Sequence, residues 1–310
     1  MPPFTDPPRA VLHGVKSNPF VEASGEDFAL GEPLERPGGG HWTPYALDAD
    51  LRTLHWSRTP EPAASYDAPF LYLAQYRHAD ALGTSCPLRL PEAGGGRRTF
   101  VFSVGRCGST LLTRMAEAGG LAALSEPDAL VALGVRPKGC RERGDKLYAP
   151  LLDAVIRSSG LDPSARTLVK LRAQHSTPDH LSRIRRALPE ADFVFVFREP
   201  RAWARSMVGH FGLDVDRLLA LYDGAARACA EALASGAQAR VLLFEDMAND
   251  GAATATALGL ADDLTVPCDS AQSGTRLARK PEPDADGLRT VDAFMREWPG
   301  IARGRSFLPY

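Results

Sequence analysis

The stretch TFVFSVGRCGST (Thr99–Thr110) joins an apolar run to a turn with two glycines. An almost continuously apolar run such as 99–104 is typical of a strand buried on both faces of a parallel sheet. Gly105 and Gly108 let the backbone come close to an anion, and the N–H groups of a loop that opens a helix point toward such an anion. The stretch therefore predicts a buried strand, a phosphate-binding loop and a helix over 110–118.

Downstream of this loop, short apolar runs alternate with helical patterns. We expect further strands at 121–124, 167–171, 193–197 and 240–244, and helices at 146–158, 178–188, 201–210, 216–235 and 251–258. This alternation predicts an α/β, three-layer fold with a mostly parallel central sheet and a P-loop-type phosphate-binding loop. In such a fold ligands bind at the carboxyl ends of the strands, which places the site after the strands at 99–104, 167–171 and 193–197.

The first part of the chain has a different character. Residues 1–66 are dense in Pro and Gly and show little sustained periodicity, which indicates turns and excludes a long helix. Apolar and aromatic residues at helical spacing predict one helix over 68–82 that docks on the main domain. Residues 92–98 have the composition of a linker. We therefore expect an N-terminal accessory region, 1–97, and an α/β domain, 98–310.

Composition and charge exclude several classes of function. Of the 310 residues, 36 are Lys or Arg and 38 are Asp or Glu, so the basic excess of a nucleic-acid-binding protein is missing. No run of ~18 apolar residues predicts a membrane span, and the first residues lack a secretory pattern, which predicts a cytoplasmic protein. The five cysteines are scattered without close pairs, so no metal site is expected.

The side chains of the loop support anion binding. Arg106 supplies a positive charge and a planar fork of donors, while Ser109 and Thr110 can cap the helix and donate from their hydroxyls. The loop differs from the G-x-x-x-x-G-K-S/T motif of nucleoside triphosphate-binding proteins, because Gly105 and Gly108 are closer together and no Lys follows Gly108.

A second motif begins where the apolar run FVFVF (193–197) ends. Arg198 follows this run directly, and Ser206 comes eight residues later, about two turns into the next expected helix. An Arg at the carboxyl end of a strand and a Ser in the following helix can hold one phosphate between them.

The two motifs, in this order, resemble those of sulfotransferases that use 3′-phosphoadenosine 5′-phosphosulfate (PAPS). The family's 5′-phosphosulfate loop commonly reads P-K/R-S-G-T/S-T; here Gly105 stands at the Pro, Arg106 at the basic position and Cys107 at the Ser. Arg at that position is found in the tyrosylprotein and bacterial branches. The resemblance covers about residues 98–285. It implies that PAPS is bound by Gly105, Arg106, Cys107, Gly108, Ser109 and Thr110 at the 5′ end and by Arg198 and Ser206 at the 3′-phosphate.

Two further segments resemble the family's pattern. Arg240–Met247 (RVLLFEDM) is similar to a strand that often ends in Tyr/Phe-Glu-Asp-Leu ahead of a helix. Arg279 and Lys280 resemble the basic R-K-G segment that closes over the 3′-phosphate, with Pro281 in place of the Gly.

The resemblance also implies catalytic roles. Arg106 would contact the 5′-phosphate and the bridging oxygen, and Lys170 would be a second cation near the sulfuryl group. Glu126, twenty residues after Arg106, matches the catalytic base of several branches. Another branch has a His two residues after the Lys; Arg172 stands there, and His175 lies close by. The choice between Glu126 and His175 stays open, and no metal is required.

Alternatives remain at this point. A P-loop kinase is the strongest, because Leu242–Asp246 resembles an acidic strand end that holds magnesium. A nucleotide-binding module without catalysis is the other. The acceptor is expected to be a small-molecule, carbohydrate or peptide hydroxyl, or an amine, and a homodimer is one of the oligomeric states left open.

Overall fold

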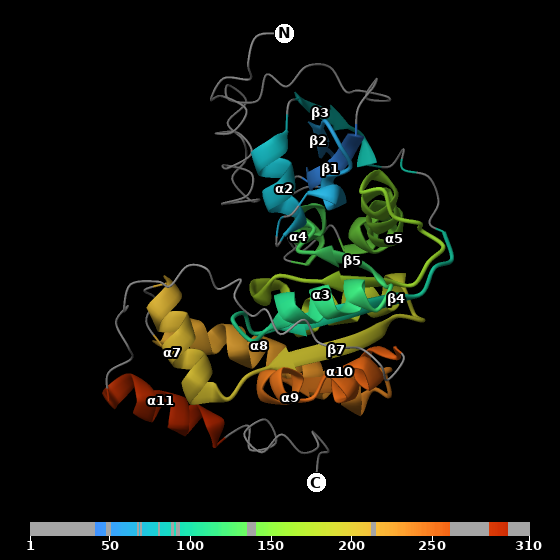
Figure 1. Cartoon of the computed structure of the whole chain (residues 1–310). Coiled ribbons are helices and arrows are strands. Elements are labelled where there is room, and N and C mark those ends of the chain that lie inside the picture. Colours follow the sequence, from blue (N-terminus) through green and yellow to red (C-terminus); the bar gives the residue numbers. More distant parts are fainter. Residues whose placement is uncertain are drawn as a thin grey trace, which may run out of the picture. The chain divides into compact units, whose positions relative to one another are not determined.

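The structure is a computed structural model that describes residues 41–47, 51–66, 68, 70–79, 81–87, 90, 94–134, 141–211, 215–260 and 285–296. The described chain divides into two compact units (Figure 1). The first contains the described parts of 1–98, 124–169 and 182–190, and the second those of 99–123, 170–181 and 191–310. We describe each unit by itself.

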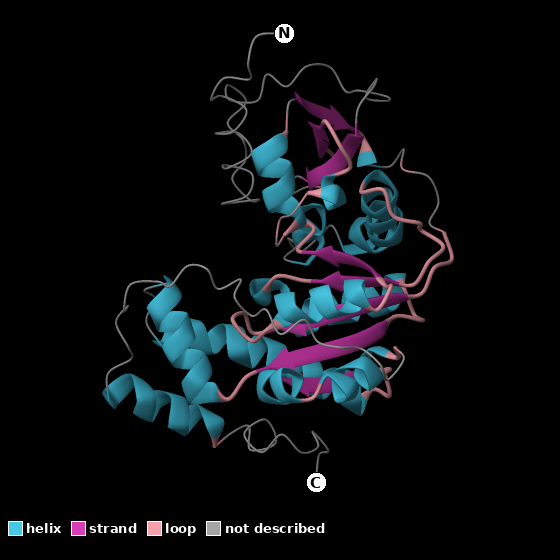
Figure 2. Cartoon of the chain, viewed as in Figure 1, coloured by secondary structure: helices cyan, strands magenta, loops and turns pink. Residues whose placement is uncertain are grey.

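Five strands form one sheet in the order β5-β6-β4-β7-β8. Their bounds are β4 Arg98–Ser103, β5 Ala122–Ser125, β6 Thr167–Lys170, β7 Asp192–Phe197 and β8 Ala239–Leu243. β4 pairs in parallel with β7, and β7 in parallel with β8. The strands lie within one residue of the predicted ranges at each end, and the expectation of an α/β fold with a mostly parallel central sheet is confirmed (Figure 2).

Helices alternate with these strands along the chain. The predicted helices are observed, some with longer ends: α5 begins at Arg141 and includes Pro150, and α7 extends to Phe211. The helices are α3 Ser109–Ala118, α4 Val131–Gly134, α5 Arg141–Ser158, α6 Pro178–Ala187, α7 Pro200–Phe211, α8 Val215–Ala234, α9 Phe244–Asn249, α10 Gly251–Leu258 and α11 Ala285–Met295, with short 3-10 turns at 63–65, 128–130 and 173–175.

The two central strands are buried along their whole length. Every residue of β4 and of β7 is buried. Phe102 of β4 packs against Phe195 of β7 with ring centroids 5.2 Å apart. Burial on both faces explains the apolar runs 100–102 of β4 and 193–197 of β7, and these runs are the reason the sequence identifies the two strands so clearly.

The N-terminal region contains a sheet that the sequence did not predict. β1 (His41–Leu47), β2 (Leu54–Thr59) and β3 (Ala81–Ser85) form an antiparallel sheet in the order β1-β2-β3. The prediction of one helix over 68–82 is wrong at both ends, because α2 covers only Leu71–His78 and the chain then enters β3. Pairing with β2 satisfies the backbone of β3, and this long-range pairing overrides the helical spacing of its side chains.

Helix α2 is fastened to the small sheet by a buried amide. Gln75 Nε2 donates to the Pro44 carbonyl oxygen at 3.0 Å and to Ser57 Oγ at 3.1 Å. Tyr45 and Ala46 form a buried apolar cluster, and Tyr72 of α2 packs against this cluster. These contacts belong to the first unit and give it a core of its own.

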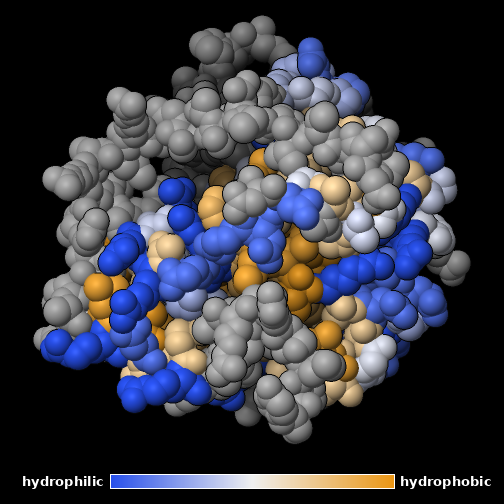
Figure 3. Space-filling view, turned by 60° about the horizontal axis from the view of Figure 1, so that its bottom comes forward, coloured by the Kyte–Doolittle hydropathy of each residue, from blue (hydrophilic) through white to orange (hydrophobic). Residues whose placement is uncertain are grey.

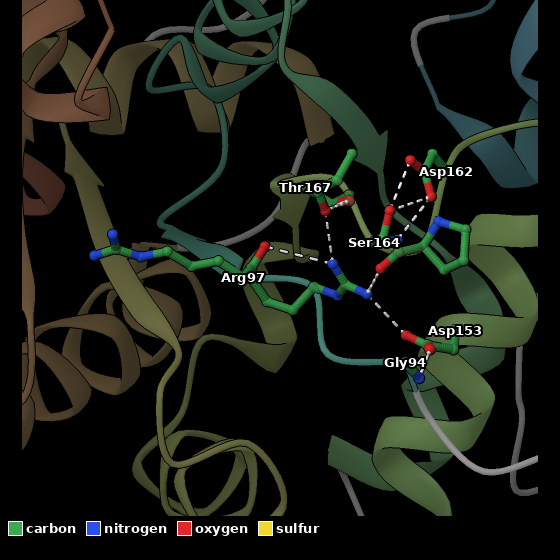
Figure 4. A network of polar contacts seen from close by, with 9 residues as sticks. Gly94, Arg97, Asp153, Asp162, Ser164 and Thr167 are labelled. Atoms are coloured by element: carbon green, nitrogen blue, oxygen red, sulfur yellow. Dashed lines mark hydrogen bonds and ion pairs between the residues drawn. The ribbon is translucent and has the colours of Figure 1, made fainter.

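Arg98 is part of a buried polar network rather than of a linker. Its guanidinium pairs with Asp153 Oδ1 of α5 at 2.9 Å and donates to the carbonyl oxygens of Ala165 and Pro163. The backbone N–H of Gly94 donates to the other oxygen of Asp153, as Figure 4 shows. The expectation that 92–98 forms a linker is therefore wrong at Arg98, where burial requires the charge to be paired.

We expect Asp153→Ala to destabilise the first unit by about 3 kcal/mol, because it leaves the buried Arg98 charge without its carboxylate. Urea unfolding followed by circular dichroism measures this change. Glu142→Ala is the matched control, since it breaks an ion pair with Lys146 whose two side chains are 84% and 72% exposed. Equal destabilisation by the two substitutions would contradict the prediction.

The described surface is mixed in character. On the face drawn in Figure 3, hydrophilic and apolar residues both reach the surface. Among the described residues, no helix is long and apolar enough to cross a membrane.

Candidate functional site

The loop between β4 and α3 has an unusual backbone. Gly105, Arg106 and Gly108 have φ values of 72°, 51° and 79°, all in the left-handed region. A Cβ atom at Gly108 would lie 2.5 Å from a ring carbon of Phe244, so this position requires glycine for space as well as for φ. A positive φ is uncommon at an arginine, and such strained residues cluster at functional sites.

The structure brings together the two motifs predicted from the sequence. Arg198 Nη1 donates to the Arg106 carbonyl oxygen at 3.2 Å, and Arg106 Nε donates to Ser206 Oγ at 3.3 Å. Arg106 comes from the loop, Arg198 from the end of β7 and Ser206 from α7. All three belong to the second unit, so this arrangement lies within one compact body.

The positive charges of Arg106 and Arg198 are only partly neutralised by nearby carboxylates. Among the described residues, no carboxylate lies within ion-pair distance of Arg106. Desolvation, and then repulsion from Arg198, lower the pKa of Arg106 from its ordinary value. Two guanidinium groups held close together, beside the positive end of α3, favour the binding of an anion.

Arg198 is oriented by the two residues that follow β8. Its guanidinium carbon lies 4.7 Å from the centre of the Phe244 ring, and its Nε lies 4.0 Å from Glu245 Oε1. Arg198 Nε has no hydrogen-bond partner among the described residues. The carboxylate of Glu245 also accepts the backbone N–H of Glu199. The sequence pattern did not place Phe244 and Glu245 in the site, although their position at the carboxyl end of a strand beside β7 is a usable signal.

The other loop residues differ in exposure. Cys107 is fully buried and Ser109 is 5% exposed, whereas Gly108 and Thr110 are half-buried. Burial raises the pKa of the Cys107 thiol. Because the thiol is inaccessible, any contact of Cys107 with a ligand has to come from its backbone.

Lys170 lies at the end of β6 and is 2% exposed. Its charge acts on the Cys107 thiol and opposes part of the rise in the pKa caused by burial. Lys170 ends β6, the strand that neighbours β4 in the sheet.

The two candidate bases have different environments. Glu126 directly follows β5 in the first unit, is half-buried and has a φ of 53°, so it is a second strained candidate residue. His175 belongs to the second unit and is buried. Desolvation, with His180 and Arg172 nearby, lowers the pKa of His175 to about 3. Such a group is a weak base at neutral pH.

Two predicted site residues, Arg279 and Lys280, lie outside the described residues. Across the described ranges, no group of three or more His, Cys, Asp and Glu side chains is arranged to hold a metal ion.

Comparison with known proteins gives structural likenesses without a sequence match. No protein-family model matches the chain, and no curated protein matches its sequence. Among solved structures, the chain is similar to a sulfotransferase from Alicyclobacillus acidocaldarius, with 16% identity and a TM-score of 0.43 over 69% of this chain and 98% of that one. It is also similar to sulfotransferase STF1 from Mycobacterium tuberculosis H37Rv, with 14% identity and a TM-score of 0.41 over 67% and 78%.

A third solved structure is the sulfotransferase domain of the olefin synthase from Synechococcus PCC 7002. It has 16% identity and a TM-score of 0.38, over 66% of this chain and 97% of that domain. All three of these solved structures are of sulfotransferases.

Proposed function

We propose that the chain transfers a sulfuryl group from PAPS to a hydroxyl or amine of an acceptor. The observation that carries the proposal is the hydrogen bond between Arg198 and the Arg106 carbonyl oxygen. It joins the glycine loop, suited to one phosphate, to the strand-end arginine, suited to another. A nucleotide with phosphates on both its 3′ and 5′ positions has this pattern of charge.

The residues present fit such a donor. Gly108 is the N-cap of α3 and no side chain caps this helix, so the N–H groups of its first turn are available to an anion. We propose that the loop, Gly105 to Thr110, holds the 5′-phosphosulfate. Arg198 and Ser206 would hold the 3′-phosphate, since the Arg198 side chain is 25% exposed and a guanidinium and a hydroxyl can hold one phosphate between them.

When bound, PAPS would supply an activated sulfuryl group on a good leaving phosphate. Arg106 would neutralise the charge that grows on this phosphate, and the buried Lys170 would act as a second cation. Glu126 would take the proton of the acceptor hydroxyl. We prefer Glu126 to His175 as the base because the pKa of His175, about 3, makes it a poor proton acceptor.

Other parts of the proposal come from the sequence alone. Arg279 and Lys280 would add positive charge around the 3′-phosphate. The division at residue 97 and a cytoplasmic location stay predictions, and so does an acceptor that is a small molecule, a carbohydrate or a peptide. A homodimer stays one of the possible oligomeric states.

Thermal shift measurements with adenosine 3′,5′-bisphosphate and with ATP, each with and without Mg²⁺, test the donor. We expect stabilisation by the bisphosphate without metal and a smaller shift with ATP. Arg198→Ala should weaken bisphosphate binding about 10- to 100-fold, because a charge-assisted contact to phosphate is lost. Arg205→Ala, which removes an exposed arginine of the same helix as Ser206, should leave binding unchanged. A larger shift with ATP and Mg²⁺ would favour a kinase and contradict the proposal.

A further inference from the structure

One face of α7 lies against the anion-binding loop. Trp203, Ser206 and Met207 follow the i, i+3, i+4 spacing that places side chains on one side of a helix. The indole N–H of Trp203 donates to the carbonyl oxygens of Val104 and Gly105, at 3.1 and 3.0 Å. The side chain of Met207 lies 3.7 Å from the point where a Cβ of Gly105 would stand. The backbone at the start of the loop is therefore held from α7.

A second buried ring holds the end of β7. The hydroxyl of Tyr222, on α8, donates to the Arg198 carbonyl oxygen at 3.1 Å. The ring of Tyr222 packs edge-to-face on Trp203, with centroids 4.9 Å apart and an angle of 73° between the planes. Phe197 and Phe294 pack around the same tyrosine.

Neither ring is accessible to a ligand. Trp203 and Tyr222 are both 0% exposed, so they can act on a bound nucleotide only through the groups that they hold. The indole N–H of Trp203 and the hydroxyl of Tyr222 each donate a hydrogen bond to a backbone carbonyl oxygen of the site. Burial raises the pKa of Tyr222 well above its ordinary value, so its hydroxyl stays a donor over the usual pH range.

From this geometry we infer that Trp203 and Tyr222 are positioning residues for the two ends of the nucleotide. Trp203 fixes the loop that holds the 5′ end, and Tyr222 fixes the backbone of Arg198, which holds the 3′-phosphate. Their edge-to-face contact sets the spacing between the two anion-binding groups. The inference rests on the proposed function and adds to it the residues that determine selectivity for a doubly phosphorylated nucleotide.

Trp203 and Tyr222 affect nucleotide binding because a buried carbonyl oxygen without a hydrogen-bond donor is unfavourable in free energy. A Phe at either position keeps an aromatic ring but removes the donor, which leaves a buried acceptor without one of its hydrogen bonds. The backbone then shifts to find another partner, and the attached anion-binding group moves with it. Because Tyr222 and Trp203 hold different groups, their loss should have different effects on nucleotides with one and with two phosphates.

Isothermal titration calorimetry with adenosine 3′,5′-bisphosphate and adenosine 5′-monophosphate separates the two roles. We expect Tyr222→Phe to weaken binding of the bisphosphate about tenfold and to leave binding of the monophosphate unchanged. Trp203→Phe should weaken both by a similar factor, because both nucleotides use the loop. Trp203→His, which restores a ring N–H donor, should recover part of the loss.

Tyr148→Phe is the matched control. Tyr148 is also fully buried, but it belongs to the first unit, so its substitution should change neither affinity. A Tyr222→Phe protein that melts cooperatively and keeps the wild-type ratio of the two affinities would overturn the inference. Loss of the cooperative melting transition in both Phe variants would assign the pair to folding and would overturn it as well. A wild-type protein with no preference for the bisphosphate would instead overturn the proposed function.

Discussion

Replacing Glu126 with Gln is expected to lower kcat for sulfuryl transfer by about 10²–10⁴-fold and to leave binding of adenosine 3′,5′-bisphosphate unchanged. Gln keeps the size and hydrogen-bonding capacity of the side chain, so the variant removes little besides the ability to take a proton. Glu126 also has a φ of 53°, a strained conformation that is retained only where its surroundings impose it. Steady-state kinetics with PAPS and calorimetry with the bisphosphate measure the two quantities separately.

Glu190→Gln serves as the matched control, since it changes an exposed glutamate of the same unit. It should keep full activity. Wild-type turnover in Glu126→Gln would exclude Glu126 as the base and leave His175 as the remaining candidate. Loss of nucleotide binding in Glu126→Gln would assign a structural role to this carboxylate.

Arg106→Ala is expected to lower kcat by about 10²–10³-fold, because it removes the guanidinium that would neutralise the leaving phosphate. In the wild-type structure Arg106 has no carboxylate partner among the described residues, so the substitution leaves no buried ion unpaired. Arg106→Lys should recover only part of the activity, since an ammonium group lacks the planar fork of donors. Initial rates at saturating PAPS measure the effect.

The backbone of Arg106 offers an internal control for this prediction. Its φ of 51° suits glycine better than arginine. Arg106→Gly therefore relieves strain while it removes the same charge as Arg106→Ala. Equal loss of activity in the two variants is expected if the charge is what matters. An active Arg106→Gly protein would show that loop conformation, and not the guanidinium, supports turnover.

The α/β sheet and the two motifs could be predicted from the sequence because the patterns that indicate them lie within short stretches of adjacent residues. A strand buried on both faces, such as β7, carries a run of adjacent apolar residues, here 193–197, and this run is visible directly in the sequence. Gly108 and Arg198 follow such strands, and a residue after a parallel strand lies at the ligand-binding edge of the sheet. The sequence predicted that the two motifs bind opposite ends of one nucleotide, and in the structure Arg106 contacts both Arg198 and Ser206.

The small antiparallel sheet was missed because the strand signal in β2 is short. The run LHWSRT of β2 alternates apolar or aromatic with polar residues only over its first four positions, and two of its buried residues, Ser57 and Thr59, are polar. β1 is harder to recognise, because Pro44 lies inside it and the register shifts between Pro44 and Ala46. β1 is held by its pairing with β2 and by the hydrogen bond from Gln75 of α2 to the Pro44 carbonyl oxygen. Both contacts join parts of the chain that are distant in sequence.

The sequence by itself determined the elements of the main sheet, the glycine loop and the residues that could hold an anion. These features can be predicted because backbone propensity and burial determine which residue types occur next to one another in a strand, a helix or a turn. The tertiary structure alone decided that Trp203 and Tyr222 hold the carbonyls of Gly105 and Arg198, and that Arg98 is buried against Asp153. These contacts join residues that are 24 to 98 positions apart in the sequence. The periodicity of a sequence does not predict which distant carbonyl oxygen accepts a hydrogen bond from a given buried donor.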